Sequence, residues 1–73
     1  MKIRYTAMEN PKDEGMYLGL NVLTCEDGHK IVHVSAYSYE PVLWENGWGN
    51  LVPEYWTELP TVEEVEGARY VTE

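Results

Sequence analysis

The chain has 73 residues, a formal net charge of −8 at pH 7 and a single cysteine. A domain near this size hides only about 60% of the surface that its unfolded chain exposes, so we expect residues 1–73 to form one small domain without a deep pocket. A chain this acidic is repelled by phosphate backbones, which argues against direct nucleic-acid binding, and a lone cysteine excludes an internal disulfide.

No targeting or membrane segment is evident. The first residues, MKIRYTAMENPKD, lack the apolar region of a signal peptide. No apolar run approaches the roughly 20 residues that cross a bilayer. We therefore expect a soluble, intracellular protein that makes no membrane contact.

The first half of the chain predicts strands separated by turns. Residues 2–7 alternate as a first strand, and the segment 9–15, ENPKDEG, has the composition of a turn. Two longer alternating runs, 16–24 and 30–38, flank Asp27-Gly28, which is a strong hairpin signal. In the first run Met16, Leu18, Leu20 and Val22 share one face, and in the second run Val32, Val34 and Ala36 share one face.

A second hairpin is predicted around the tryptophans. Asn46-Gly47 favours a two-residue type I′ turn. That turn would place Trp44 and Trp48 on opposite faces of the sheet, so one indole would be exposed, whereas a longer loop would place both on one side. A short strand is then expected at residues 55–58, with Pro53 outside the ladder.

The C-terminal residues fit two structures. Thr61 and Glu64 have the spacing of a helix capping box, whereas residues 68–72, ARYVT, alternate like a strand. We expect a single helical turn followed by a strand. The fold class predicted from the whole pattern is mainly β, with α+β as the alternative: a small antiparallel sheet of four to five strands with one short helical turn near the C-terminus.

The aromatic residues predict an interaction surface. The chain has six Tyr, three Trp and no Phe, so every ring carries a polar group, and such rings are common at interfaces. Residues 40–73 carry eight acids and one arginine, which would steer the chain toward a basic surface. The predicted partner-binding residues are Tyr37, Tyr39, Glu40, Trp44, Glu45, Trp48, Glu54, Tyr55 and Glu58. The alternative interpretation is that the rings cover a thin core and that the charge keeps the protein soluble.

No combination of residues supports catalysis or metal binding. Cys25, His29 and His33 straddle a hairpin and lack a fourth metal ligand. Pairs of carboxylates such as Glu54 and Glu58 would need a cleft that this domain is too small to wall. No glycine-rich phosphate loop precedes a helix. We therefore predict no catalytic residues, no metal, no cofactor and no enzyme activity.

Three segments resemble a known family. NPKDEGMYLGLNVLT, WENGW and YWTELPTVEE are similar to the small phage and prophage proteins grouped as domain of unknown function 551. The likeness covers about residues 10–60 and is strongest at Trp56, Leu59 and Pro60; Tyr55 stands where the family usually has His, and no Trp opens the chain. The resemblance implies a small β-rich fold, a phage-like origin and a location in the cytoplasm of a bacterial host cell. It implies no mechanism.

Three functions follow as hypotheses. The first is a non-catalytic acidic protein-interaction module, a phage or prophage accessory protein that binds and inhibits a host protein by occupying a basic nucleic-acid-binding surface. The second is a structural homodimer in which the aromatic residues bury against a second copy. The third is a small-ligand module in which Trp and Tyr stack on a sugar or a base.

Overall fold

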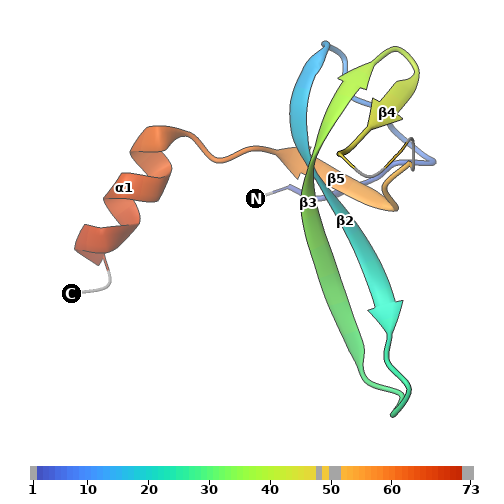
Figure 1. Cartoon of the computed structure of the whole chain (residues 1–73). Helices are drawn as coiled ribbons and strands as arrows, with labels where there is room; N and C mark the ends of the chain where they lie inside the picture. The colour runs from blue at the N-terminus through green and yellow to red at the C-terminus, as the bar shows by residue number, and fades with distance from the viewer. Residues whose placement is uncertain (1, 48, 50–51, 72–73) are drawn as a thin grey trace.

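The computed structural model describes residues 2–47, 49 and 52–71. Five strands form one antiparallel sheet of order β1-β5-β2-β3-β4, and one helix follows (Figure 1). The predicted mainly β class, with an antiparallel sheet and a short C-terminal helix, is confirmed. The elements are β1 (Arg4–Tyr5), β2 (Gly15–Thr24), β3 (Lys30–Glu40), β4 (Leu43–Glu45), β5 (Tyr55–Glu58) and α1 (Val62–Val71).

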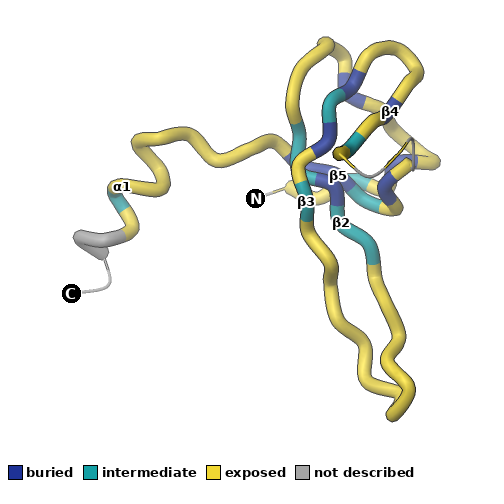
Figure 2. The backbone as a smooth tube through the Cα atoms, in the orientation of Figure 1, coloured by how far each residue is buried: buried dark blue, intermediate teal, exposed yellow. Residues whose placement is uncertain are grey.

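The β2–β3 hairpin is the longest feature of the sheet. These strands pair from Gly15 and Tyr39 at one end to Thr24 and Lys30 at the other. Strand β5 joins β2 only along 17–20, and β4 joins β3 only at 38–40. Residues 22–34, called the arm below, therefore project from the body of the sheet as two strands and a turn (Figure 1). Every residue of the arm is exposed (Figure 2).

The turn at the end of the arm confirms the predicted hairpin. The Cys25 N–H donates to the His29 carbonyl at 2.7 Å, and the Gly28 N–H donates to the Cys25 carbonyl at 3.0 Å. Gly28 has a φ of 90°, a conformation that side-chain-bearing residues rarely adopt. The Asp27 carboxylate accepts from the His29 N–H at 3.0 Å and so closes the turn.

The core lies at the base of the sheet and consists of aromatic rings. Four rings are buried and Tyr17 packs against them, with neighbouring centroids as close as 4.7 Å in tilted or edge-to-face contacts. The loop 6–14 closes over this cluster by accepting both indole N–H groups. Trp56 Nε1 donates to the Glu9 carbonyl at 2.7 Å, and Trp44 Nε1 donates to Asn10 Oδ1 at 3.3 Å. The buried rings are Tyr37, Tyr39, Trp44 and Trp56.

Two sequence predictions differ from the structure around the later turns. The bridge after β4 joins Asn46 to Gly49 rather than Glu45 to residue 48, so the turn lies one residue later than Asn46-Gly47 predicts. Trp48, placed by that prediction, lies outside the described residues. The first strand is also shorter than 2–7, since only Arg4 and Tyr5 pair with β5.

The C-terminal segment is a helix throughout its described length. The predicted capping box is confirmed, because Glu64 N–H donates to Thr61 Oγ1 at 3.1 Å and Thr61 N–H donates to Glu64 Oε1 at 2.9 Å. The predicted strand at 68–72 is wrong: the helix continues past Gly67, which costs only about 1 kcal/mol in a helix interior. Among the described residues α1 contacts no strand, and it lies away from the sheet in Figure 1.

Gly19 is required by the packing of the core, which generates the first prediction. A Cβ atom at this position would collide with the Tyr37 ring and lie 2.8 Å from Pro53 Cβ. We expect Gly19→Ala to lower the free energy of unfolding by about 1–3 kcal/mol, as overpacking does, measured by denaturant titration. Gly67→Ala, whose added methyl meets nothing within 4 Å, is the control. Equal stability of the two variants would contradict the packing argument.

Candidate functional site

The two faces of the sheet differ in their side chains and in how far other segments of the chain pack over them. Paired residues on neighbouring strands share a face, so the register assigns every side chain of the sheet. One face holds the aromatic core. The other, called the aliphatic face below, consists of Met16, Leu18, Leu20, Val22, Val32, Val34, Ala36, Leu43 and Tyr55.

Much of the aliphatic face is open to solvent, although Leu18, Leu20 and Tyr55 are half-buried and Thr57, which pairs with Leu18, is buried. Met16 is 50% exposed, Val32 56% and Val34 48%. Helix α1, the one helix among the described residues, does not contact it. Single exposed apolar residues are ordinary, but a continuous apolar surface marks an interaction site.

Charged side chains stand at both ends of this face. Glu40 and Glu45 line a shallow hollow with Ser38 and Leu43 at the end formed by β3 and β4. Lys30 stands at the opposite end, beside the turn of the arm, where it pairs with Thr24. Ten residues of extended strand place Lys30 about 33 Å from Glu40. The face therefore has an apolar centre, an acidic end with Glu40 and Glu45, and an opposite end where Lys30 stands beside the turn acids Glu26 and Asp27.

Three of the predicted partner-binding rings are core residues. Tyr37, Tyr39 and Trp44 are 2–3% exposed and cannot contact a partner. That part of the prediction is wrong because the loop 6–14 and Pro53 supply a cover that strand alternation does not reveal. Trp56, the other described indole, is buried in the same cluster.

Two of the predicted acids are engaged within the chain. Glu58 forms an ion pair with Arg4 at 2.6 Å, and the Arg4 guanidinium lies 4.5 Å from the centroid of the Trp56 ring. The hydrogen bond from Arg4 holds the pKa of Glu58 below its ordinary value. Glu54 Oε1 accepts from the Val22 N–H at 3.2 Å, and its own N–H donates to Asn21 Oδ1 at 2.8 Å. Glu54 therefore caps the edge of β2 just before β5 begins.

Of the remaining predicted residues, Glu40, Glu45 and Tyr55 share the aliphatic face, and Trp48 lies outside the described residues. Glu40 and Glu45 lie at its acidic end, and Tyr55 lies at its β5 edge opposite Leu20. Tyr55 also contacts Tyr5, with ring centroids 5.4 Å apart. The aliphatic residues themselves were not predicted as a site. Their alternation was visible, but both faces of β2 and β3 carry large side chains, and alternation does not show which face is covered.

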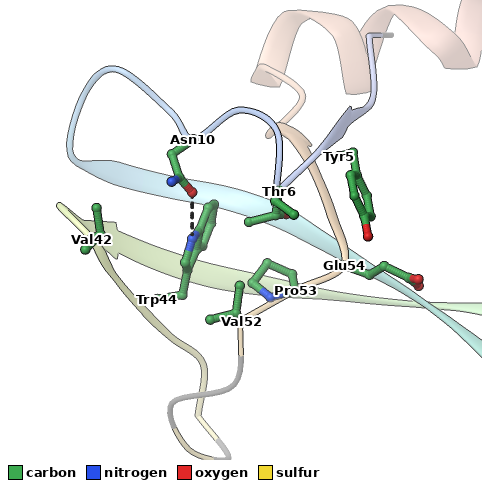
Figure 3. A pocket seen from close by; sticks show the side chains of 9 residues that line it. Tyr5, Thr6, Asn10, Val42, Trp44, Val52, Pro53 and Glu54 are labelled. Atoms are coloured by element: carbon green, nitrogen blue, oxygen red, sulfur yellow. Dashed lines mark hydrogen bonds between the residues drawn. The ribbon is translucent and has the colours of Figure 1, made fainter.

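A hollow of about 320 Å³ lies on the other side of the sheet, between the loop 6–14, β4 and residues 52–54 (Figure 3). This volume is at the low end for ligand pockets. Trp44 lines it, but its indole N–H is bound to Asn10 and its ring is 2% exposed. Neither described tryptophan offers a free face for stacking on a sugar or a base.

The described residues form neither a metal centre nor a membrane-spanning helix. Within the described ranges, no group of three or more His, Cys, Asp or Glu side chains is arranged to hold a metal ion. The described part of the chain contains no helix with the length and apolar character needed to cross a membrane.

Comparison with known proteins adds no relative. No protein-family model, no curated protein and no solved structure matches this chain. The resemblance to domain of unknown function 551 stays a prediction.

The Arg4–Glu58 pair generates a pH prediction. Because the folded-state pKa of Glu58 lies below its ordinary value of 4.5, its contribution to stability is present above pH 4.5 and is lost as the pH falls through the lower folded-state value. We expect the unfolding free energy of Glu58→Gln to fall less steeply than that of the wild type below pH 4.5, measured by denaturant titration across a pH series. Glu14→Gln, at an exposed loop carboxylate, is the control. Parallel pH curves for the wild type and Glu58→Gln would contradict the prediction.

Proposed function

We propose that this chain is a non-catalytic protein-interaction module that binds another protein chain through the aliphatic face of its sheet. The observation that carries the proposal is the exposure of Met16, Val32 and Val34 on one continuous apolar surface. Apolar surface gains roughly 25 cal/mol per Å² when it leaves water. A face of this kind stabilises a complex as soon as a complementary surface covers it.

The shape of the face favours a protein partner over a small molecule. A small ligand is held in a concave pocket that buries most of its surface, whereas this face is an open strip two to three strands wide. Its acidic end, Glu40 and Glu45, disfavours the phosphate backbone of a nucleic acid. A flat apolar strip with charged ends is the anatomy of a protein interface.

The charged ends also define the partner. The surface that covers Glu40 and Glu45 must carry cationic groups, because like charges across an interface cost several kcal/mol. The hypothesis of a host protein with a basic surface also requires cationic groups opposite Glu40 and Glu45. Such a host protein would contact Glu40, Glu45 and Tyr55, and it would not contact the buried rings Tyr37 and Trp44.

The proposal is tested by capture with matched variants. The tagged full chain is expressed in bacteria beside a differently tagged second copy, and captured proteins are identified by mass spectrometry. Val32→Asp places a charge on the aliphatic face, and Ile31→Asp places one on the opposite face of the arm at nearly equal exposure, 51% against 56%. We expect Val32→Asp to weaken capture at least tenfold and Ile31→Asp to leave it near the wild-type level.

Thermal unfolding of both variants checks that each remains folded. Equal loss of capture in the two folded variants would show that the aliphatic face has no special role. Unchanged capture in both would show that binding occurs elsewhere. Either result overturns the proposal.

A further inference from the structure

We infer that the partner covering the aliphatic face is a second copy of this chain, packed sheet against sheet about a twofold axis that runs across the strands. The inference rests on the proposed function, because it names the occupant of the same face. Packed sheets lie about 10 Å apart with their strands within about 30° of each other. The two copies would thus form a small sandwich whose inner layer is aliphatic.

The distribution of charge favours contact at this place. The chain carries −8 in total, yet residues 20–36, which include the arm, carry only Glu26 and Asp27 against Lys30. The region is therefore at −1 and the rest of the chain at −7. The acidic end of one copy is repelled least by this region of the other, so contact is favoured where the arm of each copy lies over the Glu40 end of its partner.

The charged ends select the orientation of the two copies. A twofold axis across the strands exchanges the ends of the face, so Lys30 of each copy lies over Glu40 and Glu45 of the other. A twofold axis along the strands would place Lys30 against Lys30 and Glu40 against Glu40. Opposite charges attract and like charges repel across an interface. The antiparallel arrangement is therefore the complementary one.

Addition of a copy at the edge of β3 does not make the same contact. Strand β4 already pairs with Ser38–Glu40. An incoming strand would thus be limited to the part of β3 before Ser38, and its Lys30 would not reach Glu40 along the ladder. Contact between Lys30 and Glu40 distinguishes face packing from edge pairing.

The size of the face sets the expected affinity. A strip two strands wide and ten residues long, widened by β5 along 17–20 and by β4 at 38–40, covers about 430 Å². Two copies would bury about 900 Å² together, which is below the range of stable interfaces. We therefore expect a reversible dimer that dissociates in the micromolar range.

A charge exchange tests the inference on the full chain. Sedimentation equilibrium over a concentration series measures the dimer constant. We expect Lys30→Glu and Glu40→Lys each to weaken the dimer at least tenfold, because each brings like charges together. The double variant, Lys30→Glu with Glu40→Lys, should return to within about threefold of the wild type. Lys12→Glu, which makes the same change of net charge in the loop 6–14, should have little effect.

Recovery in the double variant would report contact between copies. Lys30 and Glu40 are about 33 Å apart within one chain, so they do not compensate each other there. Thermal unfolding of each variant confirms that it remains folded.

Other outcomes would overturn the inference. A strict monomer at high micromolar concentration excludes a second copy as the partner. That result overturns the inference whether the face is covered by a foreign protein or by α1 of the same chain. If Lys30→Glu leaves the dimer constant unchanged, or if the double variant does not restore it, the antiparallel face contact is excluded. If the copies stay apart while capture of a foreign protein is still lost in Val32→Asp, the inference falls and the proposed function stands.

Discussion

Closure of the loop 6–14 over the aromatic cluster is the constraint on which the rest of the structure depends. Two indole N–H groups, from Trp44 and Trp56, reach this loop and are satisfied by Asn10 and by the Glu9 carbonyl. A buried N–H group without a partner costs about 1–3 kcal/mol, so these two bonds fix the loop on that side of the sheet. The side that the loop covers becomes the core.

The choice of covered side leaves the other side open. A chain of 73 residues has enough residues outside its strands to cover one face of a small sheet. Here the loop 6–14 covers the face that carries the aromatic rings. Helix α1 does not contact the sheet among the described residues. The aliphatic side chains, which would form the core of a two-layer domain, therefore lie at the surface. The proposed function and the proposed partner both follow because the described chain leaves most of the aliphatic face uncovered.

Most of the strand pattern could be read from the sequence because local rules govern it. Alternation defined β2 and β3, Asp27-Gly28 defined their turn, and the Thr61–Glu64 spacing defined the start of α1. The turn after β4 was misplaced by one residue, because Asn-Gly is only a preference and the bridge between Asn46 and Gly49 closes a different pair. The end of α1 was not predicted, because residues 68–72 alternate like a strand whereas the helix continues to Val71.

The sequence alone determined β2, β3 and the chemistry of each of their faces, because side chains alternate along a strand whatever lies around it. It placed Val32 and Val34 together, and Tyr37 on the opposite side. Only the tertiary structure decided which of those faces is buried. Burial depends on where a distant loop finds hydrogen-bond partners, and the contacts from Glu9 to Trp56 and from Asn10 to Trp44 join residues more than thirty positions apart.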